Sequence, residues 1–115
     1  MKTSILKEKS YKYAIRIVKL SQYLQSQKKE FVLSKQILCS GTSIGALVME
    51  AEFGQSRADF TNKMSIALKE ANETDYWLSL LKDTEFINDK LFASLQKDCK
   101  ELIAMLVSTV KTSKR

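Results

Sequence analysis

The stretch CSGTSIGALVMEAEFGQS, residues 39–56, holds all three glycines of a 115-residue chain that contains no proline. Such a stretch can be a phosphate-binding loop, a break between domains, or a helix with small residues on one face. A phosphate-binding loop requires GxxxxGK[ST] after a strand, and no lysine follows Gly41 or Gly45. Apolar or small residues instead recur at helical spacing through the glycines, at Leu33, Ile37, Gly41, Ile44, Val48 and Ala51. We therefore predict a helix interior that ends near Gly54 as its C-cap.

Gly41 and Gly45 lie four residues apart and share a face with the apolar stripe. Each glycine costs a helix interior about 1 kcal/mol relative to alanine. Small residues at this spacing let two helix backbones approach closely, which offsets that cost. We predict such a close helix–helix contact here.

The rest of the chain also shows helical periodicity and predicts an all-α fold. A first helix is expected over residues 5–27, with an apolar stripe of Tyr11, Ala14, Ile15 and Val18 and with Ile17 and Leu24 beside it. The N-caps expected for the three later helices are Ser34, Ser56 and Asn88. Short connections make sequential helices antiparallel. The prediction is a single domain, residues 1–115, folded as an up-down-up-down four-helix bundle.

The third helix carries more apolar surface than one bundle core requires, because Ile66, Tyr76, Trp77 and Leu80 spread onto neighbouring faces. This surplus fits either a wide core contact or a subunit interface, where aromatic residues are enriched.

Residue types for catalysis are scarce. The chain has no histidine, which removes the commonest general base and a common metal ligand. Cys39 and Cys99 fit no metal-binding spacing and are expected to be buried thiols rather than a disulfide. Glu70 and Glu73 lie one turn apart and are expected in surface ion pairs. We predict no catalytic residue, no metal, no cofactor and no enzymatic activity.

Positive charge is concentrated at the start of the chain. Residues 1–35 carry nine Lys or Arg and two Glu, a net charge of +7 within an overall +6. Lys9, Lys12, Arg16 and Lys19 recur at helical spacing and form one stripe, and Lys28, Lys29 and Lys35 follow at the expected corner between the first two helices. The stripe fits a solvated face, a polyanion-binding face or a contact with an acidic membrane surface. Tyr11, Tyr13 and Tyr23 lie on the same helix and could stack on bases. Tyrosines at helical spacing are more often part of a core or an interface.

No apolar run is long enough to span a membrane, and the opening MKTSILKEKSYK lacks the apolar centre of a signal peptide. A cytoplasmic location is expected, with no membrane partner.

Nearly the whole chain, about residues 10–110, resembles a known family through YKYAIRIVKLSQYL, SGTSIGA and MSIALKEANET followed by WL. That family comprises four-helix-bundle proteins encoded in intervening sequences of large-subunit (23S) ribosomal RNA genes. The resemblance implies barrel-like homopentamers. A related branch, the accessory variability determinant of diversity-generating retroelements, binds nucleic acid and a reverse transcriptase. Relatives commonly carry Arg where Cys39 stands and Asn where Leu47 stands, so polar contacts made there are in doubt.

Together these observations favour a homo-oligomeric bundle, a pentamer by the resemblance, that binds nucleic acid through the seven cations named above. RNA is the expected ligand, and binding to DNA stays open. The competing hypothesis is an adaptor whose basic face docks an acidic protein such as a reverse transcriptase.

Overall fold

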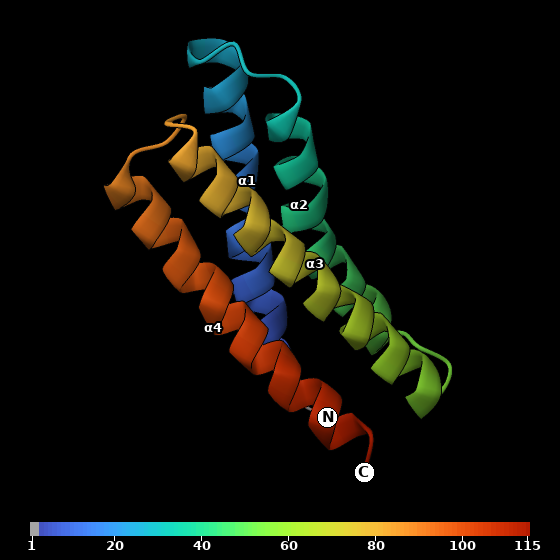
Figure 1. Ribbon diagram of the computed structural model, residues 1–115. Coiled ribbons are helices and arrows are strands. Elements are labelled where there is room, and N and C mark those ends of the chain that lie inside the picture. The colour runs from blue at the N-terminus through green and yellow to red at the C-terminus, as the bar shows by residue number, and fades with distance from the viewer. Residues whose placement is uncertain (1–2) are drawn as a thin grey trace.

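The structure is a computed structural model that describes residues 3–115, and it consists of four helices (Figure 1). These are α1 (Ser4–Gln27), α2 (Leu33–Glu52), α3 (Arg57–Asp83) and α4 (Asp89–Ser113), and no strand occurs in the described part of the chain. Successive helices run antiparallel, so both ends of the chain lie at the same end of a rod of 44 × 20 × 19 Å. The predicted all-α antiparallel four-helix bundle is confirmed.

The glycine stretch lies inside α2, as predicted, and it brings α2 close to α1. A Cβ atom on Gly41 would lie 2.7 Å from Cγ1 of Ile17, and one on Gly45 would lie 3.3 Å from the backbone oxygen of Ser10. Real Cβ atoms do not approach a carbon atom as closely as 2.7 Å, so only glycine fits at position 41 in this packing. The closer packing of α1 against α2 thus offsets the loss of helix propensity at the two glycines.

One apolar core fills the space between the helices. Its largest fully buried side chains include Tyr13, Ile17, Ile37, Ile44, Met64, Leu78, Leu95, Leu102 and Leu106. The stripe predicted through residues 33–51 contributes Ile37, Ile44, Val48 and Ala51 to this core. The stripe predicted for the first helix is wrong as a core face, because Tyr11, Ile15 and Val18 are exposed. The helix instead buries the face that carries Leu6, Ser10, Tyr13, Ile17, Leu20, Ser21 and Leu24.

Two of the three predicted N-caps are confirmed. The Ser56 hydroxyl accepts a hydrogen bond from the backbone N–H of Asp59 at 3.0 Å, and the Asn88 side chain accepts one from Leu91 at 2.8 Å. The third prediction is wrong, because Ser34 is fully buried within α2 and caps nothing.

The Glu30 carboxylate caps α2 instead of Ser34. It accepts hydrogen bonds from the backbone N–H groups of Val32, Leu33 and Ser34 at 3.2, 3.0 and 2.8 Å. A carboxylate at this place satisfies otherwise unpaired N–H groups and interacts favourably with the helix dipole.

Gly54 follows the C-cap of α2, which is Phe53, and it does not adopt a positive φ. The predicted glycine C-cap is therefore displaced by one residue. Lack of space explains the glycine, since a Cβ there would lie 2.8 Å from Oδ2 of Asp59 and 3.1 Å from the backbone oxygen of Ala51.

The contact between α1 and α4 is the slightest of the four contacts between neighbouring helices, and much of it is polar. The buried hydroxyl of Tyr13 donates to the backbone oxygen of Leu95 at 3.0 Å, and Arg16 reaches Ser94 and Asp98. We call this contact the α1–α4 seam. Three hollows lie along it, and the basic stripe of α1 borders two of them.

Candidate nucleic-acid interface

The four cations of the predicted stripe lie on the flank of α1 that faces α4, and three of them are paired with carboxylates. Lys9 lies 3.1 Å from Glu101 and Lys12 lies 2.9 Å from Glu8. Lys19 is exposed and has no ion pair among the described residues. The stripe is therefore continuous in the structure but largely neutralised.

Arg16 makes the most extensive of these contacts. Its Nη1 lies 2.8 Å from Oδ2 of Asp98 and 3.3 Å from the backbone oxygen of Ser94, and its Nη2 donates to the Ser94 hydroxyl at 2.9 Å. The Arg16 side chain thus stabilises the α1–α4 seam and is held in one orientation. Ion pairs that are this exposed contribute only about 0–1 kcal/mol each, so phosphate groups can compete for the same cations.

Lys28, Lys29 and Lys35 surround the α1–α2 connection at one end of the rod. All three are exposed, and no carboxylate lies within 4.0 Å of their amino groups in the part of the chain that the structure describes. Glu30 lies among them, but its carboxylate bonds to the first backbone N–H groups of α2. Phe31 and Val32 are exposed beside these lysines. We call Lys28, Lys29 and Lys35 the lysine corner.

A second group of cations, not predicted as a site, lies at the opposite end of the rod. Arg57 begins α3, and Lys111, Lys114 and Arg115 end the chain. All four are exposed and make no ion pair among residues 3–115. The sequence indicates Lys111, Lys114 and Arg115 through the basic tail KTSKR. Arg57 could not be assigned from sequence, because its proximity to the tail depends on the antiparallel fold.

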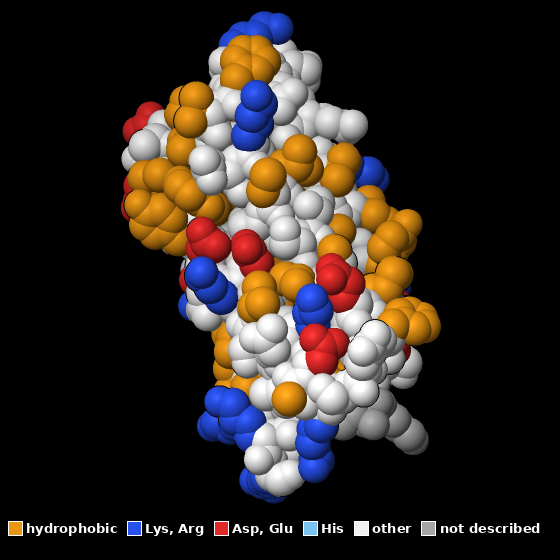
Figure 2. Space-filling model, turned by 90° about the vertical axis from the view of Figure 1, so that its right-hand side faces the viewer, with side chains coloured by type: hydrophobic (Ala, Val, Ile, Leu, Met, Phe, Trp, Pro, Cys, Tyr) orange, Lys and Arg blue, Asp and Glu red, His pale blue; other side chains and the backbone are white. Residues whose placement is uncertain are grey.

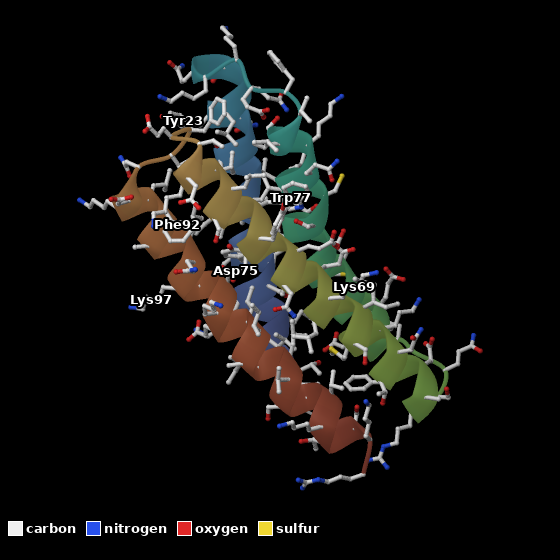
Figure 3. All side chains as sticks on the ribbon, viewed as in Figure 1. Tyr23, Lys69, Asp75, Trp77, Phe92 and Lys97 are labelled. Carbon is white, nitrogen blue, oxygen red and sulfur yellow. The ribbon has the colours of Figure 1, made fainter. Side chains whose placement is uncertain are left out.

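The predicted interface residues divide into two groups. Tyr76 is 61 % exposed and Ile66 is 37 % exposed, whereas Trp77 and Leu80 are half-buried. Trp77 packs edge-to-face against Tyr76 with ring centroids 5.0 Å apart (Figure 3). Tyr11, Ile15 and Val18 form a second exposed apolar surface on α1, although their spacing predicts a core face.

Figure 2 shows the charged and apolar side chains on the face seen from the right of Figure 1. Apolar side chains gather along both edges of this face, and charged side chains of both signs lie between them. Among the ion pairs of the described residues, Lys63 and Glu50 lie 3.5 Å apart and join α3 to α2.

The buried titratable side chains are poorly suited to react. Burial raises the pKa of the Cys99 thiol to about 12 and also raises the pKa of the Tyr13 hydroxyl. Burial, together with the neighbouring carboxylate of Glu73, raises the pKa of Glu70. No group of three His, Cys, Asp or Glu side chains able to hold a metal ion occurs among residues 3–115. None of the helices is both long enough and apolar enough to cross a lipid bilayer.

The two cysteines differ in environment, which corrects the expectation that both are buried. Cys39 is exposed on α2 and Cys99 is fully buried, with its thiol donating to the backbone oxygen of Ala71 at 3.3 Å. Since the thiolate is the reactive form, we expect Ellman's reagent to modify one thiol per native chain rapidly and the second only after unfolding. Cys39→Ser should abolish the rapid phase. Two rapid thiols in the native protein would contradict the burial of Cys99.

The chain matches a family model and solved structures. A family model described as 23S rRNA-intervening sequence protein matches residues 2–108. A solved crystal structure, of a protein of unknown function from the S23 ribosomal protein family of Bacteroides thetaiotaomicron, is 56 % identical, with a TM-score of 0.91. The similarity covers 92 % of this chain and 98 % of that one. No curated protein matches the chain.

Proposed function

The chain belongs to the 23S rRNA-intervening sequence protein family, and from this premise we propose that it is a non-enzymatic, homo-oligomeric bundle that binds nucleic acid, chiefly RNA. The pentameric state is the one that the sequence resemblance implies. The observation that carries the proposal is the lysine corner, where three exposed cations have no carboxylate partner among the described residues. Such cations gain most from a phosphate backbone, because each neutralised phosphate releases condensed counterions.

The stripe on α1 adds a second cationic contact in this proposal. Lys19 is unpaired among residues 3–115, and Lys9 and Lys12 are held by exposed carboxylates that a phosphate backbone can replace. Arg16 keeps its bonds to Asp98 and Ser94 and has further N–H donors for phosphate. In a ring of identical protomers the lysine corners recur around the axis, so that several can contact one strand and raise its affinity by avidity.

A cyclic assembly is supported by two separate apolar surfaces. Tyr11, Ile15 and Val18 are exposed on α1, whereas Tyr76 and Ile66 are exposed on α3. A two-fold dimer uses one surface twice, but a head-to-tail ring needs two different surfaces on each protomer. The exposed residues on α1 and on α3 belong to different helices and so fit the second arrangement.

Light scattering combined with RNA titration tests this proposal. We expect a particle of about five times the 13.1 kDa chain mass and binding of a labelled single-stranded RNA that weakens steeply between about 50 and about 200 mM salt. Ile15→Glu and Tyr76→Glu should each dissociate the ring, since they alter different halves of one interface. A monomer at micromolar concentration would contradict the assembly, and absence of RNA binding at low salt would contradict the function.

The alternative function is an adaptor for an acidic protein, such as a reverse transcriptase. The pairing of Lys9, Lys12 and Arg16 with carboxylates favours it, because the same stripe would suit carboxylates on a partner surface. A wild-type protein that binds no RNA at low salt would favour this alternative.

A further inference from the structure

A hollow of about 360 Å³ lies in the α1–α4 seam, between the second half of α1 and the first turns of α4. It is lined by Arg16, Lys19, Leu20, Tyr23, Leu91 and Leu95. Figure 3 shows Tyr23 at the end of the bundle where α3 connects to α4, the same end as Phe92. The volume falls within the range of about 300–1,000 Å³ that is usual for small-ligand sites.

The lining combines three kinds of surface. Leu20 and Leu95 are 4 % and 1 % exposed and form a floor that belongs to the core. Tyr23 is 39 % exposed, so part of its ring is available to a ligand. Arg16, Lys19 and Tyr23 follow one another at steps of three and four residues, which places both cations and the ring on one flank of α1.

This combination of an aromatic ring, an apolar floor and adjacent cations is the one that proteins use to bind single-stranded nucleic acid. We propose that the hollow receives an unstacked nucleobase against the ring of Tyr23, while Arg16 and Lys19 contact the flanking phosphates. The inference rests on the proposed function and specifies its substrate class as single-stranded RNA. Bases in a duplex are already stacked and paired, and so they are not available to such a hollow.

Arg16 is well placed for this role without giving up its present contacts. Its Nη1 and Nη2 atoms bond to Asp98 and Ser94, which fixes the guanidinium plane at the edge of the hollow. A guanidinium group has five N–H donors, so donors remain for a phosphate oxygen. Lys19, which has no ion pair among residues 3–115, supplies the second cation.

The other hollows fit a nucleobase less well. The hollow beside Lys9 and Lys12 measures only about 130 Å³, and its tyrosine, Tyr13, is buried. The hollow of about 470 Å³ at the far end of the rod includes the carboxylate of Glu52, which repels phosphate. The hollow of about 530 Å³ on α3 also joins an exposed ring, that of Tyr76, to Lys69, but the carboxylate of Glu73 lines it and repels phosphate.

Fluorescence anisotropy with one labelled RNA, as a single strand and as a duplex, tests the inference in the full-length protein. Tyr23→Ala should weaken single-strand binding by about 5- to 150-fold, which corresponds to about 1–3 kcal/mol for one stacked base. Duplex affinity should stay unchanged, because the cations remain. Tyr23→Phe retains the ring and should bind as the wild type does.

Phe53→Ala is the matched control, because it removes an exposed aromatic ring at the far end of the rod, away from this hollow and from both apolar surfaces assigned to the assembly. It should leave single-strand affinity unchanged. Circular dichroism melting verifies that each variant folds. The inference would be overturned, and the proposed function kept, if the wild type binds RNA and Tyr23→Ala binds it with the same affinity. The same conclusion would follow if Tyr23→Ala weakens the binding of single-stranded and duplex RNA equally.

Two further outcomes would also overturn it. If Tyr23→Ala reduces the particle mass but not the RNA affinity, the hollow holds part of a second copy. If the variant loses only the binding of anionic phospholipid vesicles, the hollow faces a membrane. Failure of the wild type to bind any RNA at low salt would overturn the proposed function and the inference together.

Discussion

Gly41→Leu is expected to destabilise the bundle strongly, by about 3 kcal/mol or more. Even the first carbon of the new side chain would lie 2.7 Å from Cγ1 and 2.8 Å from Cγ2 of Ile17, which is itself fully buried. Overpacking of a core costs about 1–3 kcal/mol for small insertions and more for larger ones. A domain of this size is stable by only about 5–15 kcal/mol. Far-ultraviolet circular dichroism during urea titration measures the loss.

Two variants separate steric overlap from a general effect of leucine in α2. Ala46→Leu adds the same side chain at an exposed position of the same helix and should change stability by less than about 0.5 kcal/mol. Ile17→Ala removes Cγ1 and Cγ2, the two atoms nearest Gly41, so Gly41→Ala should cost less stability in the Ile17→Ala background than in the wild type, a coupling that a double-mutant cycle detects. A Gly41→Leu protein that unfolds at the wild-type urea concentration would refute the close helix contact.

Reversing the lysine corner, with Lys28, Lys29 and Lys35 each changed to Glu, is expected to weaken RNA binding by about 100-fold or more. Each phosphate contact contributes about 0.7–0.9 to the slope of log K against log salt, so three lost contacts remove about two orders of magnitude near 0.1 M. The three side chains are exposed and unpaired within the described chain, so helicity should be unaffected. Anisotropy titrations at several salt concentrations give both the affinity and the slope.

Lys12→Glu with Lys19→Glu provides the comparison on the stripe. Lys12 is already partnered by Glu8 at 2.9 Å, so this pair should lose less affinity per charge than the corner does. Arg16 is better left unchanged in this comparison, because a carboxylate there would face Asp98 and weaken the α1–α4 seam. If the corner variant binds as the wild type does, the phosphate contacts lie elsewhere, with the cations around Arg57 the next to test.

Periodicity was sufficient for the architecture but not for the orientation of the first helix. Residues 11–24 carry two overlapping apolar stripes, one through Tyr11, Ile15 and Val18 and one through Tyr13, Ile17 and Leu20. Both have helical spacing, so the sequence alone cannot say which faces the core. The packing partners decide, since Gly41 leaves space only where Ile17 enters.

The sequence predicted which cations form the candidate site, but it did not predict which of them are paired with carboxylates. The seven cations are visible as charges in the sequence, but the pairing of Arg16 with Asp98 joins residues 82 positions apart. The capping of α2 by Glu30 rather than Ser34 depends equally on the path of the connection. Because of that capping, the charge of Glu30 is directed to the helix and not to the neighbouring lysines, which the charge count alone could not reveal.

The topology gives this protein a low contact order. The three tighter helix–helix contacts join consecutive helices, α1 with α2, α2 with α3 and α3 with α4, and only the slight α1–α4 seam joins the two ends of the chain. Closing short loops costs little entropy, so chains with mainly local contacts fold fast. The glycine-mediated contact of α1 with α2 needs only the short connection between them. The α1–α4 seam is thus the one helix–helix contact that can form only when all four helices are present. The proposed RNA-binding hollow lies in this seam, and so in the part of the bundle that influences the folding rate least.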